Sequence, residues 1–238
     1  MKIATWNCNG AFRNKFQHIS HLDADVLIIQ ECENPETISK KNKNYHQFAK
    51  NTLWCGTNNK KGLGVFARDE IALKKLEWNH LWNGRSLQWF LPFRINDKQT
   101  ILAVWNHRAD AKAFSYIGQF WLFLQNNRQE FKNLIIAGDF NSNSNFDAWD
   151  RWWNHSDCIK ELKEKNIESV YHTLFNIEQG TEKLSTFFFR KDPKKGFHID
   201  YIFGDRGAIN KTKAFNVFDF NDWKEYSDHV PVVWEYEW

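Results

Sequence analysis

Polar and charged side chains stand where apolar segments of this 238-residue sequence end. They are Asn7, Glu31, Asn106, His107, Asp139, Asn141, Asp228 and His229, and Asp200 lies inside the apolar segment 198–203. A sheet holds the side chains at its strand ends in fixed positions, and functional groups of α/β proteins collect there. If these ends meet in the folded chain, carboxylates, amides and imidazoles share one site.

Such a cluster predicts a particular chemistry. Oxygen ligands without thiolates favour Mg²⁺ or Mn²⁺ over zinc, and clustered carboxylates repel one another unless a cation neutralises them. A divalent ion beside a His/Asp pair is suited to attack on a phosphate ester, because the ion takes charge from the phosphoryl oxygens while a base directs water. The expected cofactor is therefore Mg²⁺ or Mn²⁺.

Short apolar runs predict the strands that position these groups. The runs 25–30 and 133–138 are typical of strands buried on both faces. Further strands are expected at 2–6, 44–50, 63–67, 86–95, 99–105, 184–190, 197–203, 212–219 and 230–236, with a hairpin turn at 58–62. Apolar spacing predicts helices over 12–22, from a cap at Asp110 to about Phe131, and in one or two stretches of 145–167.

The order of these elements predicts a mixed fold. Strands and helices do not alternate regularly, so a purely parallel sheet is not expected, and two packed mixed sheets with outer helices fit the strand count better. No repeat, linker or change in composition divides the sequence. We therefore expect a single domain over residues 1–238.

The composition is that of a globular chain with many aromatic residues. It holds 13 Trp, 21 Phe and 6 Tyr, and 42% hydrophobic with 26% charged residues exclude general disorder. No run approaches the ~20 apolar residues that span a bilayer, and no signal peptide is recognisable. A net charge of +3 is too balanced for a general nucleic-acid coat, so any basic footprint must be local.

The cysteines indicate a reducing compartment. Cys8, Cys32, Cys55 and Cys158 are scattered, without a CxxC pair or zinc-site spacing. We expect free thiols and a cytoplasmic protein, which we expect to be a monomer.

Five short blocks carry a resemblance to a known family. They are WNCNG at 6–10, QE at 30–31, GDFN at 138–141, HIDYIF at 198–203 and SDH at 227–229. In content and order they resemble the motifs of the endonuclease/exonuclease/phosphatase superfamily, which includes exonuclease III-like and DNase I-like enzymes. Each block alone is weak evidence, but the ordered set spans nearly the whole chain.

The resemblance implies a fold and a metal site. The fold would be an α/β (α+β) four-layer α/β/β/α sandwich of two packed mixed sheets with outer helices, with the site at one rim of the sheets. Glu31 would hold the metal ion, with Asn7 and Asp228 nearby.

The resemblance also implies the catalytic roles. Asp139 would orient or deprotonate the attacking water, and Asn141 would hold that water or a phosphate oxygen. His229 would contact the phosphoryl oxygens while Asp200 accepts its other ring N–H, which fixes the tautomer and favours the imidazolium. His107 stands where exonuclease III-like members resemble one another in having Tyr, and either residue can donate to a phosphate oxygen. The sequence departs from the family at His198, where Arg is usual.

Several further residues are candidates for substrate binding. Arg85 and Trp149 could contact a phosphate and stack on a base, although the expected helix around Trp149, Trp152 and Trp153 equally suits core packing. Lys194 and Lys195 lie in an expected hairpin tip that could touch a polyanion or remain a solvated turn. Lys60 and Lys61 are expected to be plain surface.

Three functions follow as hypotheses. The first is a metal-dependent phosphodiesterase acting on nucleic acid, with DNA preferred, as an endo- or exonuclease. The second uses the same site on a small-molecule or lipid phosphate ester. The third, a non-catalytic binding module, is disfavoured because acceptable residues fill every expected catalytic position.

Overall fold

Two six-stranded sheets form the centre of the structure, which is a computed structural model describing residues 1–108 and 114–238. The first sheet has the order β15-β16-β1-β2-β4-β3. Its strands are β1 (Lys2–Asn7), β2 (Val26–Cys32), β3 (Thr52–Asn58), β4 (Lys61–Ala67), β15 (Thr212–Val217) and β16 (Val232–Tyr236). The second has the order β11-β14-β10-β9-β8-β5. Its strands are β5 (Leu73–Lys75), β8 (Phe90–Ile95), β9 (Gln99–Trp105), β10 (Leu134–Asp139), β11 (Ile167–Ser169) and β14 (Asp200–Asp205).

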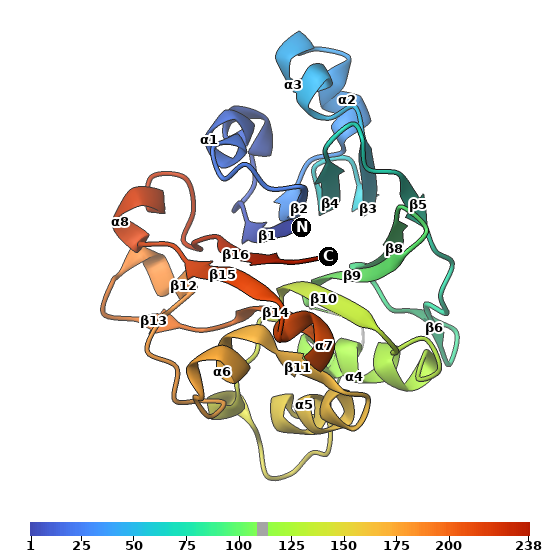
Figure 1. The fold of residues 1–238 in the computed structure, drawn as a ribbon, viewed down its shortest axis with the longest axis vertical. Helices are drawn as coiled ribbons and strands as arrows, with labels where there is room; N and C mark the ends of the chain where they lie inside the picture. The colour runs from blue at the N-terminus through green and yellow to red at the C-terminus, as the bar shows by residue number, and fades with distance from the viewer. Residues whose placement is uncertain (109–113) are drawn as a thin grey trace.

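Helices cover the outer face of each sheet (Figure 1). The first sheet is covered by α1 (Phe16–Ser20), α2 (Pro35–Ser39) and α3 (Lys43–Phe48), and the second by α4 (Ile117–Asn126), α5 (His155–Glu164) and α6 (Val170–Phe175). The remaining short helices are α7 (Arg206–Ile209) and α8 (Phe220–Trp223), with 3₁₀ turns at Phe12–Asn14, Ser144–Phe146 and Phe189–Lys191. The predicted α/β/β/α sandwich of two mixed sheets is confirmed.

The hydrophobic core has three parts, which explains the aromatic content. Aliphatic side chains such as Ile3, Val65 and Ile101 fill the space between the sheets. Rings such as Trp6 and Phe123 lie among the outer layers, between each sheet and its helices. Large rings fill the uneven gaps that helices leave on a twisted sheet, and they bury much apolar area per residue.

Strand pairing brings the polar strand ends together. In the first sheet β1 and β2 run parallel, with Asn7 opposite Gln30 at their ends. In the second sheet β9 and β10 run parallel, so that Trp105 and Asp139 end side by side. Since β14 runs antiparallel to β10, its first residue, Asp200, pairs with Asp139, the last residue of β10.

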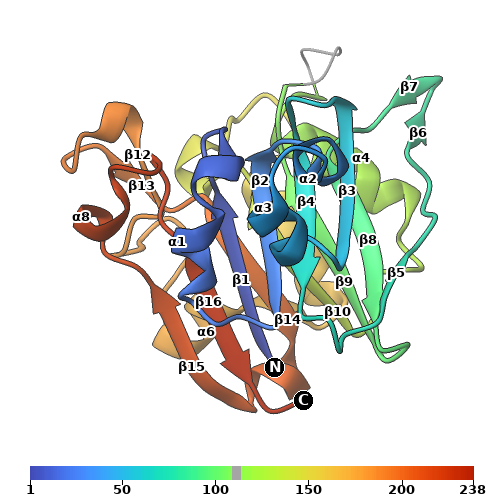
Figure 2. The ribbon, with the colours of Figure 1, turned by 90° about the horizontal axis from the view of Figure 1, so that it is seen from above.

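Two small ribbons flank the sheets (Figure 2). The hairpin of β12 (Phe187–Phe188) and β13 (Gly196–Phe197) carries the predicted basic tip, and β6 (Leu81–Trp82) pairs with β7 (Arg85–Ser86) on the opposite flank. Both chain termini lie at the far end of the sheets from β12 and β13. The longest described helices have 10 residues, so none of them could cross a membrane.

Three local predictions were wrong. The segment 44–50 is not a strand, because Asn42 caps α3 by accepting from the Tyr45 N–H at 3.0 Å and Tyr45 packs inward. Helix α4 is shorter than expected, and its predicted cap Asp110 lies outside the described residues. Helix α5 begins only after the tryptophans, because Asn154 and Asp157 form a capping box at its start.

Candidate active site

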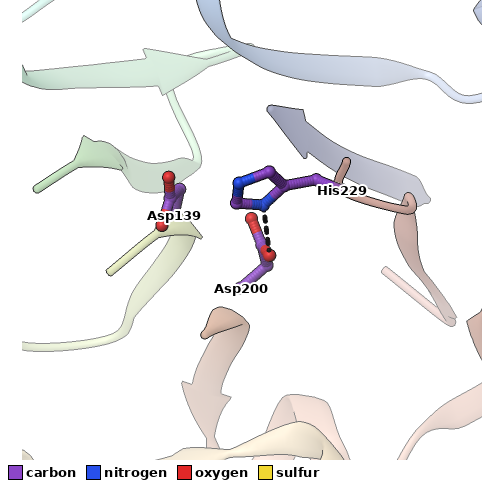
Figure 3. A group of neighbouring side chains, drawn as sticks. All are labelled: Asp139, Asp200 and His229. Carbon is purple, nitrogen blue, oxygen red and sulfur yellow. Dashed lines mark hydrogen bonds and ion pairs between the residues drawn. The ribbon is translucent and has the colours of Figure 1, made fainter. Parts of the chain in front are cut away.

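Asp139, Asp200 and His229 form a compact buried cluster at the edge of the two sheets (Figure 3). One nitrogen or carboxylate oxygen from each residue lies within 4.8 Å of the other two. Asp139 and Asp200 face each other across the pairing of β10 with β14, and His229 comes from the segment just before β16. Gly138 makes this edge possible, because a Cβ on it would lie 1.8 Å from the Val104 carbonyl oxygen.

His229 is fixed from several sides. Its Nδ1 lies 2.9 Å from Asp200 Oδ2, and its backbone N–H donates to Ser227 Oγ at 3.0 Å. The Trp6 indole N–H donates to the His229 carbonyl at 3.0 Å. The imidazole therefore has one defined orientation, with Nε2 turned away from Asp200.

Thr186 fixes Asp200, the carboxylate partner of His229. The backbone N–H groups of Ile199 and Asp200 donate to Thr186 Oγ1 at 3.0 and 2.9 Å. Asp200 Oδ1 is buried without a hydrogen-bond partner among the described residues. One carboxylate oxygen thus orients His229, and the other retains acceptor capacity.

Burial and neighbouring charges set the ionisation of the cluster. Burial raises the pKa of Asp139 to about 7, and the charge of Asp200 acts in the same direction. Burial alone would lower the pKa of His229, but the charge and hydrogen bond of Asp200 outweigh it and raise this pKa to about 9. At neutral pH, the site therefore holds an imidazolium beside a carboxyl group that can exchange a proton.

Asn7 links this cluster to Glu31. Its Nδ2 donates to Asp139 Oδ2 at 2.9 Å and reaches Glu31 Oε1 at 3.4 Å. Glu31 is the extra residue of a bulge between Gln30 and Cys32 in β2, and its φ is 61°. Such a bulge re-aims a side chain, and left-handed backbone at a non-glycine residue is typical of functional sites. An ion pair joins the Glu31 carboxylate to Lys61 Nζ.

Asn141 and its neighbours complete the surroundings of Asp139. The Asn141 backbone N–H donates to Asp139 Oδ1 at 2.8 Å, and its side-chain Nδ2 donates to Asp139 Oδ2 at 2.9 Å and to the Asn106 carbonyl at 2.8 Å. The His107 ring packs 4.9 Å from the Trp105 ring. Burial lowers the pKa of His107, whereas the charge of Glu31 raises it.

Asp228 belongs to the same edge. Ser227 Oγ donates to the Asn7 carbonyl at 2.7 Å and lies 3.4 Å from Asp228 Oδ1. The charge of Asp228 contributes to the raised pKa of His229. The structure thus brings together every predicted metal and catalytic residue: Asn7, Glu31, His107, Asp139, Asn141, Asp200, Asp228 and His229.

The donor set fits a hard divalent cation. Glu31, Asn7 and Asp228 offer only oxygen acceptors toward a metal, and Asp139 and Asp200 add further negative charge. Asp200 Oδ1 has no hydrogen-bond partner in the described part of the chain, and a cation or its hydration water would satisfy this buried acceptor. Mg²⁺ and Mn²⁺ prefer this chemistry.

The four predicted substrate contacts lie in different places. Lys194 and Lys195 are exposed at the β12–β13 hairpin, where they line an open cavity of about 530 Å³ with Phe189 and Phe197. Phe197 stacks on Phe187, whose ring lies 4.7 Å from that of His229, so this hairpin adjoins the cluster.

The other two predicted contacts lie apart from the carboxylates. Arg85 is exposed on the ribbon of β6 and β7, which is tied to α4 by an Asn126 hydrogen bond to the Leu81 carbonyl. Trp149 is 98% exposed in the connection before α5. The structure brings neither residue into contact with the acidic cluster.

Two positions at the site had no role in the sequence-based prediction: Thr186 holds the Asp200 backbone, and Lys61 pairs with Glu31. Asn106, which the strand-end pattern had included, lies buried beside Asp139. Lys61 lies at the surface as expected, but it is not plain surface, because its ammonium pairs with Glu31. The only sequence signal for Lys61 was its place within the predicted hairpin turn at 58–62.

Solved structures share this architecture over the whole chain. An AP endonuclease from Archaeoglobus fulgidus has a TM-score of 0.74 at 15% identity, with 100% of both chains covered. The 3′ phosphatase NExo from Neisseria, bound to a product DNA hairpin, has a TM-score of 0.70 at 18% identity, again with 100% of both chains covered. At these identities the likeness establishes the fold. None of the curated proteins matches the sequence significantly.

The fold and the acidic–imidazole edge together define a hydrolase of phosphate esters, of the metal-dependent nuclease and phosphatase class. The profile described as "Endonuclease/Exonuclease/phosphatase family" matches residues 4–229. The chain belongs to this family.

Proposed function

We propose that the protein is a Mg²⁺- or Mn²⁺-dependent phosphodiesterase that hydrolyses DNA, as an endo- or exonuclease. The observation that carries the proposal is the His229–Asp200 pair beside Asp139, joined through Asn7 to Glu31. This arrangement combines three groups at one sheet edge: the imidazolium of His229, the proton acceptor Asp139 and the oxygen ligands of the Glu31 site.

Glu31 would be the main metal ligand, with Asn7 and Asp228 beside it. A bound divalent ion would withdraw charge from the phosphoryl oxygens of the substrate. The bulge at Glu31 and the hydrogen bonds of Asn7 hold these groups in place before metal binds.

Asp139 would orient and deprotonate the attacking water. Its pKa of about 7 lies near neutrality, which is suited to a general base, since the base must be ionised yet still attract a proton. Asn141 holds both Asp139 oxygens and would present its amide to the same water or to a phosphate oxygen.

His229 would stabilise the charge that develops on the phosphoryl oxygens. Asp200 binds Nδ1, so the imidazolium would present Nε2 to the phosphate as a hydrogen-bond donor. His107 would donate from the β9 side. Asp200 would act as a positioning residue, because it touches His229.

DNA as substrate is supported by the surroundings of the cluster and by the relatives. Lys194 and Lys195 would contact the phosphate backbone, and the rings of Phe197 and Phe187 continue from their hairpin to His229. Arg85 and Trp149 would contact more distant nucleotides. The named similar structures are an AP endonuclease and a 3′ phosphatase bound to DNA. A cytoplasmic monomer stays our prediction.

A substrate panel tests the proposal. Plasmid, single-stranded and 3′-phosphorylated DNA, RNA and small phosphate esters are incubated with Mg²⁺ or Mn²⁺, and with a chelator. We expect chelator-sensitive cleavage of DNA, and Glu31→Gln should chiefly raise the metal concentration needed for half-maximal rate. Turnover of small or lipid esters alone would favour the second hypothesis. Absence of hydrolysis on every substrate would contradict the enzyme assignment.

A further inference from the structure

We infer that Lys61 is a positioning residue of the metal site, whose ammonium holds Glu31 in the metal-free protein and competes with the divalent cation for its carboxylate. The inference rests on the proposed function, because it takes Glu31 as the main metal ligand. It concerns a residue outside the motif blocks and outside the acidic cluster.

The backbone places Lys61 opposite the bulge. Lys61 begins β4, and the next residue, Gly62, pairs with Cys32 at the end of β2. Glu31 precedes Cys32 and is the residue that the register skips. The two side chains thus leave neighbouring strands at the same point of the sheet edge.

The path of the lysine side chain is also defined. A Cβ built on Gly10 would lie 3.7 Å from Lys61 Cε, so the aliphatic stem crosses the turn that follows Asn7. The ammonium ends in an ion pair with Glu31 Oε2, while Asn7 reaches Oε1. Both oxygens of the carboxylate therefore meet donors from the protein.

The exposure of the two side chains decides how easily the Lys61–Glu31 ion pair breaks. The Glu31 side chain is 17% exposed, whereas that of Lys61 is 52% exposed. A half-exposed ammonium can leave for solvent at little cost, because partly exposed ion pairs are weak. A divalent cation at Glu31 would displace it, and the work of displacement lowers the apparent metal affinity.

Removal of the lysine charge should therefore tighten metal binding. We expect Lys61→Gln to lower the dissociation constant for Mn²⁺ alone about two- to fivefold, the range for a partly exposed ion pair. Lys61→Arg keeps the cation and should bind Mn²⁺ much as the wild type does. Lys60→Gln removes the adjacent exposed charge without touching Glu31 and is the matched control.

The measurement is a titration with Mn²⁺ followed by electron paramagnetic resonance of the free ion, without substrate. Circular dichroism verifies that each variant is folded. An unchanged or weaker affinity in Lys61→Gln would overturn the inference, as would the same gain in Lys60→Gln.

Glu31→Gln separates this inference from the proposed function. If Glu31→Gln loses Mn²⁺ binding while Lys61→Gln binds like the wild type, only the role of Lys61 is refuted. If Glu31→Gln binds Mn²⁺ normally, the metal ligand of the proposed function is wrong and the role of Lys61 is refuted with it.

Discussion

Two buried histidines of this protein carry different charges at neutral pH. His229 and His198 are 5% and 4% exposed, so burial disfavours the imidazolium of both. His229 Nδ1 meets the Asp200 carboxylate, whereas His198 Nδ1 meets the Leu184 carbonyl at 2.7 Å. The pKa of His229 is raised to about 9, and burial lowers that of His198 to about 4. A charged neighbour makes one a cation, and a neutral acceptor leaves the other uncharged.

The surroundings of His198 form a second buried polar cluster, beside the proposed catalytic edge. Ser169 Oγ lies 2.7 Å from His172 Nδ1, and His172 Nε2 lies 2.9 Å from Glu182 Oε1. Asn143 donates from Nδ2 to Glu182 at 3.1 Å and to the His198 carbonyl at 3.0 Å. This network holds the backbone of His198, and the Leu184 carbonyl holds its neutral ring.

The largest effect should come from the catalytic edge. Asp139→Asn should lower the turnover number by about two orders of magnitude or more, because the amide cannot accept the proton of the attacking water. The measurement is the initial rate of DNA cleavage at saturating metal. Circular dichroism verifies that the variant is folded, because an amide nitrogen in place of one Asp139 oxygen would face the donors of Asn7 and Asn141. Asp69→Asn, an exposed change, is the control, and a rate within tenfold of wild type for Asp139→Asn would refute the role of Asp139.

The second prediction removes the charged neighbour of His229. Asp200→Asn should lower the His229 pKa from about 9, because the Asp200 carboxylate is the main group that stabilises the His229 imidazolium. In the proposed function, activity requires the protonated His229 ring. Because a lower pKa removes this proton at a lower pH, the rate of the variant should begin to fall at a lower pH than that of the wild type. We expect a loss of about tenfold to a hundredfold at pH 8. The rate profile from pH 6 to 10 measures the shift, and an alkaline limb that does not move would contradict the comparison of the two histidines.

The third prediction concerns His198. Its folded pKa of about 4 lies below the ~6.5 of an unfolded histidine, so the unfolded chain gains the proton first as the pH falls. The stability contribution of neutral His198 is therefore full above ~6.5 and is lost as the pH drops toward 4.

His198→Gln removes this proton and keeps a donor for the Leu184 carbonyl. Between pH 7.5 and 5, the free energy of unfolding should fall by about 2 kcal/mol less in His198→Gln than in the wild type. Urea unfolding at both pH values measures it, with exposed His21→Gln as control. Equal losses in all three proteins would show that folding does not lower the pKa of His198.

The sequence was informative wherever function depends on strand ends. The runs before Glu31 and Asp139 are typical of buried strands, and motif order then predicted which ends meet. The bulge at Glu31 and the Lys61 ion pair were not visible, because both depend on the register between β2 and β4. The helix expected around Trp149 was wrong, since apolar spacing alone cannot show that Asn154 and Asp157 start the helix later.

Trp149 provides the last and smallest expected effect on stability. It is 98% exposed, whereas nearby Trp153 packs against Phe114 with ring centroids 4.7 Å apart. Trp149→Ala should change the free energy of unfolding by no more than about 0.5 kcal/mol, because no buried contact is lost, and Trp153→Ala should cost more. Thermal unfolding checks both. With stability unchanged, a weaker affinity of Trp149→Ala for single-stranded DNA would assign this ring to binding. A large destabilisation would instead show that the ring packs against the protein in solution.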